Sequence, residues 1–161
     1  MNRLRALMPI AGLLFTGCAA AVPANQSLPV EQACLVSDDT RQPITIEIAT
    51  SPAQRSQGLM SRPSLDADSG MLFVYRNERD PEDSFWMYRT LIPLDIAYLD
   101  QDGTIRAIHQ MDPCPAEKGR NCPRYPAGVP YYYALEMNQG YFQNRGLSAG
   151  DRLLRGSSAC Q

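Results

Sequence analysis

The stretch Pro93-Leu-Asp-Ile-Ala-Tyr-Leu-Asp-Gln-Asp-Gly103 decides the fold of this chain. Pro93 opens an apolar run over residues 94–99, which has the length and the side chains of a β-strand. Residues 100–103 then supply the Asp and Gly that tight turns favour. The chain returns over 104–110, so the stretch predicts a β-hairpin.

Five more segments on either side of this hairpin also have the pattern of strands. Ile44, Ile46 and Ile48 alternate with polar residues, which predicts a strand with one buried face. The other four are short apolar or aromatic runs bounded by turn residues. The five segments cover 43–49, 70–75, 84–88, 131–137 and 152–155.

Helices are few and short in this sequence. Ser51 is a good N-cap, Pro52 suits a first helical turn, and Gly58 is placed to end a helix over 53–57. Residues 140–146 have room for one more helical turn. Because strands outnumber helices, we expect a mainly β fold, a small sandwich or barrel-like domain with one or two short helices.

The first 17 residues have the pattern of a bacterial lipoprotein signal peptide. Arg3 and Arg5 precede an apolar segment that is too short to span a bilayer, and Cys18 follows it. We expect residues 1–17 to be removed and Cys18 to carry acyl chains that anchor the protein to a membrane. The alternative is an ordinary secreted protein cut near residues 19–21, without Cys18.

A tether and one domain follow the predicted anchor. Residues 18–29 have no apolar periodicity, whereas 30–161 has the length of a single domain. Removal of residues 1–17 leaves 13 basic against 17 acidic residues, a balance of −4. A mildly acidic chain is not typical of nucleic-acid binding.

The predicted signal peptide and lipid anchor indicate where the domain is located. We expect it in the cell envelope, facing the periplasm, and Ala19 after the cysteine is compatible with the outer membrane.

Four cysteines remain after the predicted anchor: Cys34, Cys114, Cys122 and Cys160. An even number in an oxidising compartment indicates disulfides, and three pairings are possible. The simplest joins Cys114 to Cys122 across a short polar loop, which leaves Cys34 to pair with Cys160. A zinc site of His109, Cys114 and Cys122 is the alternative, although it has no obvious fourth ligand.

Several short motifs occur in a fixed order along the chain. They are Gly58–Arg62 (GLMSR), Gly70–Phe73 (GMLF), Phe85–Met87 (FWM) and Pro93–Asp100 (PLDIAYLD), with Asp102-Gly103, Leu135-Glu136 and Gly150-Asp151. The ordered set resembles the family called domain of unknown function 192, over roughly residues 44–153. This resemblance implies a small, mostly β fold, often carried on exported or lipid-anchored chains, without an established activity.

One segment departs from the pattern of that family. The family usually has Lys-Asn-Thr after its Trp-Met pair, whereas this chain has Tyr88-Arg89-Thr90. A role that depends on the lysine is therefore in question here, although Arg89 supplies a charge at the neighbouring position.

Arg62 and Asp95 are candidate ligand-binding residues because each lies inside an otherwise apolar, motif-rich segment. An unpaired buried charge is strongly unfavourable, so each of them needs a partner. Arg62 would bind an anionic or sugar ligand, and Asp95 would accept hydrogen bonds from it. In the structural alternative the two form an ion pair that locks the helix to the strand.

Trp86 and Glu136 complete the set of candidate ligand-binding residues. Trp86 is the sole tryptophan, and it is either a core residue or part of an aromatic wall for a sugar or peptide ring. Asp95 and Glu136 together would suit a cell-wall carbohydrate hydrolase, which uses two carboxylates. Alternatively, Glu136 pairs with an arginine or caps backbone amides.

A third hypothesis rests on five methionines, namely Met60, Met71, Met87, Met111 and Met137. Thioether sulfur suits Cu(I), which would make this a periplasmic copper-handling protein. Their strand-like positions favour core packing instead. The sequence has no nucleophile elbow, zinc-protease motif or phosphate loop. We therefore expect a non-catalytic binding or accessory module, without a cofactor, for an envelope glycan or protein partner.

Overall fold

The computed structural model describes residues 27–161. The predicted signal peptide over 1–17, the lipidation site Cys18 and the tether up to residue 26 lie outside the described residues. At the start of the described chain, Leu28 packs against the core and the Pro29 carbonyl accepts a hydrogen bond from the Ile48 amide. Over 27–161, no helix has the length and apolar character needed to cross a membrane.

Strands dominate the described chain, which confirms the mainly β prediction. In chain order the elements are β1 (Val30–Val36), β2 (Arg41–Ala49), α1 (Pro52–Gln57), β3 (Ser69–Arg79), β4 (Ser84–Trp86), β5 (Leu94–Leu99), β6 (Ile105–Met111), the 3-10 helix η1 (Ala116–Asn121), β7 (Arg124–Pro126), β8 (Tyr131–Asn138), α2 (Tyr141–Asn144) and β9 (Arg152–Arg155).

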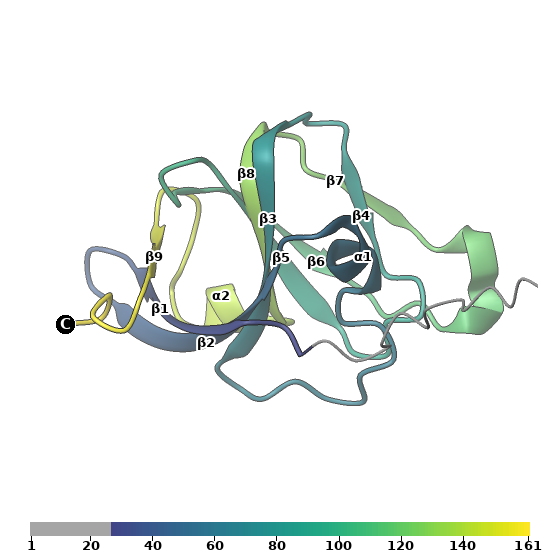
Figure 1. The fold of residues 1–161 in the computed structure, drawn as a ribbon, viewed down its shortest axis with the longest axis horizontal. Helices are drawn as coiled ribbons and strands as arrows, with labels where there is room; N and C mark the ends of the chain where they lie inside the picture. The colour runs from purple at the N-terminus through teal and green to yellow at the C-terminus, as the bar shows by residue number, and fades with distance from the viewer. Residues whose placement is uncertain (1–26) are drawn as a thin grey trace, which may run out of the picture.

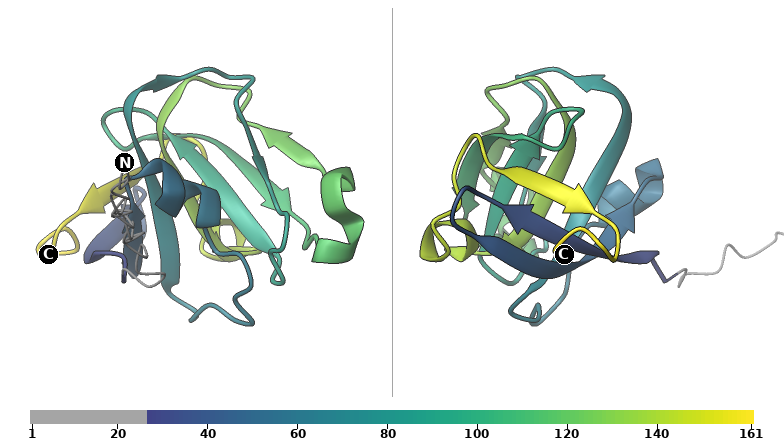
Figure 2. Two further views of the ribbon diagram at one scale, coloured as in Figure 1. Left: turned by 45° about the vertical axis from the view of Figure 1, so that its right-hand side comes forward. Right: turned by 90° about the vertical axis from the view of Figure 1, so that its left-hand side faces the viewer.

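Seven strands form one sheet in the order β6-β5-β8-β3-β2-β1-β9. The sheet curls strongly (Figures 1 and 2). The curl brings the start of β6 beside β9, where the Ile105 amide donates to the Asp151 carbonyl and the Leu153 amide donates to the Gly103 carbonyl, each at 2.8 Å. The predicted β5–β6 hairpin is present, with Leu94 opposite Met111. Strands β4 and β7 form a separate two-stranded ribbon.

Strands β2 and β3 run parallel, and this pairing explains the position of α1. Parallel neighbours need a crossover connection, which the segment between Ala49 and Ser69 supplies with α1 inside it. The predicted N-cap is confirmed. The Ser51 hydroxyl accepts a hydrogen bond from the Gln54 amide at 3.2 Å, and the Gln54 side chain accepts one from the Ser51 amide at 2.9 Å.

Both faces of the sheet are covered, and two core clusters result. On the face that we call the α2 face, Tyr141 and Phe142 of α2 pack with Leu72, Ala97, Leu135 and Met137. On the opposite face, here the ribbon face, Phe85 and Met87 pack with Met71, Phe73, Ile96 and Tyr98. All six residues of β5 are buried for this reason.

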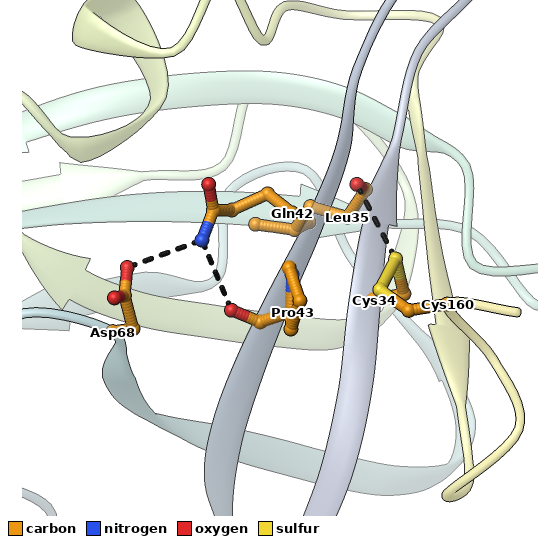
Figure 3. Close-up of a disulfide and its surroundings, with 6 residues drawn as sticks. All are labelled: Cys34, Leu35, Gln42, Pro43, Asp68 and Cys160. Carbon is orange, nitrogen blue, oxygen red and sulfur yellow. Dashed lines mark hydrogen bonds between the residues drawn. A yellow bond between two sulfur atoms is a disulfide. The ribbon is translucent and has the colours of Figure 1, made fainter.

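Both expected disulfides are present. Cys34 of β1 bonds to Cys160, which ties the C-terminal end of the chain to the sheet (Figure 3). Cys114 bonds to Cys122 and closes the segment that contains η1. Because these thiols are joined, the zinc site proposed from His109, Cys114 and Cys122 is wrong.

Candidate functional site

A small cavity lies on the ribbon face, between the end of α1, strand β4 and strand β8. Its volume is about 40 Å³, which is room for one or two water molecules. Several separate sequence motifs contribute to its wall, although they are far apart along the chain. The lining residues are Arg55, Ser56, Gln57, Gly58, Leu59, Met60, Phe73, Phe85, Trp86, Thr90 and Glu136.

Among residues 27–161, Glu136 is the only acidic residue that lines this cavity. It lies on β8 opposite Met71 of β3 and Ile96 of β5, in apolar surroundings, and is only 5% exposed. Among the hydrogen bonds of residues 27–161, none reaches its carboxyl group. Burial raises the pKa of Glu136 to about 8, so the carboxyl group keeps its proton at neutral pH.

Gly70 allows β8 to come close enough to place Glu136 there. A Cβ atom at position 70 would lie 2.3 Å from the Met137 sulfur and 2.5 Å from the Glu136 carbonyl oxygen. Such distances are too short for any side chain, so a glycine is required at this position in β3. The motif residue Gly70 therefore helps to set the depth of Glu136.

Thr90 is a buried polar residue in the wall of the cavity. Its main chain is fixed by a hydrogen bond from the Cys114 amide at 3.1 Å. Beside the cavity, Ser61 and Arg89 have the positive φ angles 62° and 58°, and the Ser61 amide donates to the Arg89 carbonyl at 2.8 Å. Residues other than glycine seldom adopt this conformation, and such strain is concentrated at functional sites.

A wider groove adjoins the cavity, and the two share the wall formed by Arg55, Ser56, Phe85 and Trp86. One part of the groove has a volume of about 340 Å³ and is also lined by Tyr75, Arg79 and Tyr131. It continues, past Arg55 and Arg79, into a part of about 750 Å³ that includes Arg76. We call the two parts the arginine groove.

The arginine groove carries positive charge in a chain whose net charge is −2. Arg55, Arg76 and Arg79 line it, against one acid, Asp83. Arg79 pairs with Asp83 at 2.7 Å, whereas Arg55 has no carboxylate partner among the salt bridges of residues 27–161.

Tyr75 holds two of these arginines in place. The guanidinium carbons of Arg55 and Arg79 lie 4.7 Å and 5.1 Å from the centroid of its ring. The Arg55 guanidinium also donates to the Val74 carbonyl at 3.1 Å. The arginines therefore have defined positions, as an anion-binding groove requires.

Trp86 is part of this wall and does not belong to the core. It is 40% exposed and lines both the cavity and the arginine groove. Its ring stacks on Tyr88, with centroids 5.1 Å apart, and the Arg124 guanidinium lies 5.7 Å from its centroid. The position of Trp86 fits the aromatic-wall interpretation of the sequence.

Arg62 does not pair with Asp95, so the expected ion pair is wrong. Arg62 binds the carboxylate of Glu47 on β2 with both terminal nitrogens, one of them at 2.7 Å. The hydrogen bond to Glu47 raises the pKa of Arg62. The pair ties the segment after α1 to the sheet, and Arg62 is absent from the lining of the cavity.

Asp95 has a different environment from the one expected. Its side chain lies on the α2 face, since it is opposite Met137 of β8 and next in sequence to Ile96 of the ribbon face. Burial raises the pKa of Asp95, while backbone hydrogen bonds from residues 140–142 lower it. Asp95 therefore faces the start of α2, with its Oδ1 atom buried and without a hydrogen-bond partner among the described residues.

The hydrolase hypothesis does not agree with this arrangement. Asp95 and Glu136 lie on neighbouring strands but on opposite faces, because register partners share a face and successive residues alternate. A glycoside hydrolase needs its two carboxylates on either side of one bond. The sheet separates this pair, so the two cannot act together on a glycan.

The copper hypothesis also finds little support. Four of the five methionines are fully buried in the two core clusters: Met71, Met87 and Met111 on the ribbon face, and Met137 on the α2 face. Only Met60 is partly exposed, in the cavity wall. Most of these thioethers therefore fill the core.

Sequence reasoning missed several residues of this site. Arg55, Tyr75 and Arg79 belong to the groove, yet none of them lies in a motif that was singled out. Thr90 lies in the segment that departs from the family pattern, which was the one available signal. Of the four candidates, the structure brings Trp86 and Glu136 together.

Comparison with known proteins gives the same fold. A crystal structure of a transcription-regulator candidate from Sinorhizobium meliloti 1021 shares 35% identity, with a TM-score of 0.71 over 81% of this chain and 97% of that chain. A protein of unknown function from Novosphingobium aromaticivorans DSM 12444 shares 30% identity, with a TM-score of 0.66 over 88% and 99% of the two chains. Among curated proteins, none matches.

Residues 33–154 match the sequence profile of DUF192, described as an uncharacterised ACR. The matched segment includes the cavity, the arginine groove and both faces of the sheet. The chain belongs to the DUF192 family.

Proposed function

We propose that this chain is an envelope lipoprotein whose β domain binds cell-wall glycan without catalysing a reaction. The observation that carries the proposal is the meeting of separate motif segments at one cavity. Gly58, Phe73, Trp86 and Glu136 come from four of the motifs, and all of them line it. Packing of the sheet alone does not require these segments to meet at a cavity, whereas binding of a ligand there does.

Charge and aromatic side chains favour a glycan as the ligand. Tyr75, Phe85, Trp86 and Tyr131 line the arginine groove, which offers apolar surface to sugar rings. The arginines beside them suit the acidic groups of cell-wall polymers. A groove of several hundred Å³ has the size of a small-ligand site.

Binding without catalysis fits the acids of the site. Glu136 is alone in the cavity, and Asp83 of the groove is already paired with Arg79. Neither arrangement provides the pair of carboxylates that glycan hydrolysis uses. The name of the Sinorhizobium protein does not extend to this chain, because an acidic, disulfide-bonded chain with an export leader is ill suited to DNA.

Glycan binding can be tested by co-sedimentation with purified peptidoglycan sacculi. The mature chain with Cys18→Ser should sediment with sacculi, and Arg55→Gln should weaken binding at least tenfold. Arg106→Gln is the matched control, because Arg106 is an exposed arginine of β6 that does not line the groove. Failure of the parent chain to sediment would contradict glycan binding and favour a protein partner.

The anchor can be tested separately by membrane fractionation of cells. The intact chain should be found with membranes and incorporate labelled palmitate, and Cys18→Ser should abolish both. A double Cys34→Ser, Cys160→Ser variant is the control, because it removes a disulfide and leaves Cys18 in place. Membrane association that survives Cys18→Ser would show that the lipid anchor is not at this residue.

A further inference from the structure

We propose that the Glu136 cavity and the arginine groove together recognise one class of sugar, an acidic N-acetylated sugar. The arginines would bind its carboxylate, and the cavity would take its uncharged acetamido group. This inference rests on the proposed glycan binding and makes it more specific.

The two parts of the site differ in the groups that they present to a ligand. The groove presents Arg55, Arg76 and Arg79 to the ligand and therefore favours an anion. The cavity adds the buried carboxyl group of Glu136, the polar residue Thr90 and apolar walls, with Arg55 on the side that it shares with the groove. Because the two parts share the wall at Arg55 and Trp86, one small ligand can reach both.

An acetamido group matches the polar groups of the cavity, whose volume of about 40 Å³ admits one end of it. A protonated carboxyl group donates one hydrogen bond and accepts another, and an acetamido group offers a carbonyl oxygen and an N–H. The acetyl methyl would then lie against Met60 and Phe73, which line the same cavity. A buried acid without a partner, such as Glu136, is satisfied by such a ligand.

Few other charged or titratable groups act on Glu136. Arg55 of α1 lines the same cavity, and Tyr75 of β3 and Tyr98 of β5 interact with Glu136 electrostatically. Burial raises the pKa of both tyrosines, so they stay neutral in the range of interest. Glu136 should therefore lose its proton in a single step, and ligand binding should follow that step.

The carboxylate requirement can be tested with two sugars that differ in one group. N-acetylmuramic acid carries a lactyl carboxylate that N-acetylglucosamine lacks. Calorimetry and the fluorescence of Trp86, the sole tryptophan, should show at least tenfold tighter binding of N-acetylmuramic acid. Arg55→Gln should remove this difference, and Arg106→Gln should keep it. Equal affinity of the parent chain for the two sugars would overturn the inference.

The acetamido requirement can be tested at Glu136. For the parent chain, affinity for N-acetylmuramic acid should fall as the pH rises through about 8, the pKa of Glu136. Glu136→Gln keeps a donor and an acceptor, so its affinity should be similar and should not change with pH. Glu136→Leu should weaken binding at least tenfold. If the leucine variant does not fold, the pH profile of Glu136→Gln decides.

The outcomes separate the two proposals. If Glu136→Gln keeps the pH dependence of the parent chain, Glu136 does not hold the acetamido group and the inference fails. If sacculi bind while the two sugars bind equally, glycan binding stands and the acidic-sugar inference fails. If sacculi do not bind at all, both fail.

Discussion

Asp95 and Glu136 lie on neighbouring strands of one sheet and face opposite sides of it. The two buried carboxyl groups therefore have separate roles. Asp95 faces the start of α2, and Glu136 lines the cavity beside Trp86. Substitutions at the two positions should accordingly have different effects on stability and on binding.

The first prediction concerns stability and pH at Glu136. Its pKa is about 8 in the fold and 4.5 in a model peptide, so between these values the folded chain binds more protons than the unfolded chain. Stability of the parent chain should therefore fall as pH rises from 4.5 to 8. By linkage the full difference is about 5 kcal/mol at most.

Glu136→Gln has no such proton to lose. Compared with the parent chain, it should be equally stable at pH 4.5 and more stable by several kcal/mol at pH 8. Urea unfolding at the two pH values measures this difference, and contributions from other groups cancel in the comparison. If the difference in unfolding free energy between Glu136→Gln and the parent chain is the same at both pH values, Glu136 is ionised in the folded chain at neutral pH.

The second prediction concerns Asp95→Asn. Asp95 faces the backbone amides of residues 140–142, and an amide oxygen is a weaker acceptor than a carboxylate, so stability should fall by about 1 kcal/mol. Binding of sacculi should not change, because Asp95 is on the α2 face. Asp112→Asn is a control at an exposed aspartate. Loss of glycan binding with unchanged unfolding would place Asp95 in the site after all.

The third prediction concerns the ion pair of Arg62 with Glu47. The side chains are 33% and 25% exposed, so the pair is only partly shielded from water. A double-mutant cycle of Arg62→Met and Glu47→Gln should give a coupling energy of about 1 kcal/mol, because both terminal nitrogens of Arg62 bind the Glu47 carboxylate. A coupling near zero, measured by denaturant unfolding, would show that the pair adds nothing to stability.

The fourth prediction compares the two disulfides. Cys34 and Cys160 are separated by 126 residues, and Cys114 and Cys122 by 8. In the chain-entropy model, removal should cost about 5 kcal/mol for the long loop and about 2.5 kcal/mol for the short one. Unfolding of the two paired Cys→Ser variants measures the order. A larger loss from the Cys114–Cys122 pair would contradict the loop-length argument.

Local patterns predicted most of the strands well. The β5–β6 hairpin and the cap at Ser51 depend on residues close in sequence, and both are present. Strand β1 was not predicted, because its sequence has no clear alternation of polar and apolar residues. It is a strand because β2 and β9 pair with it. The short β7 forms only by pairing with β4 across a long connection.

The site was only partly predictable for a related reason. A buried arginine or carboxylate indicates that a partner exists, but sequence does not name the partner. Arg62 pairs with Glu47, which occupies a polar position of β2 that the sequence does not single out. Asp95 lies near the backbone amides at the start of α2. The separation of Asp95 from Glu136 depends on strand register, and a shift by one residue would reverse it. Register is set by long-range pairing, which no single motif contains.

The most direct test of the central claim, that the Glu136 cavity and the arginine groove form the binding site, is an NMR titration. Isotope-labelled mature chain with Cys18→Ser would be titrated with N-acetylmuramic acid at pH 6.5. We expect shifts of the Gly58, Thr90 and Glu136 amides and of the Trp86 indole. Shifts confined to Gln143 and Ala149, beside Asp95 on the α2 face, would contradict the claim.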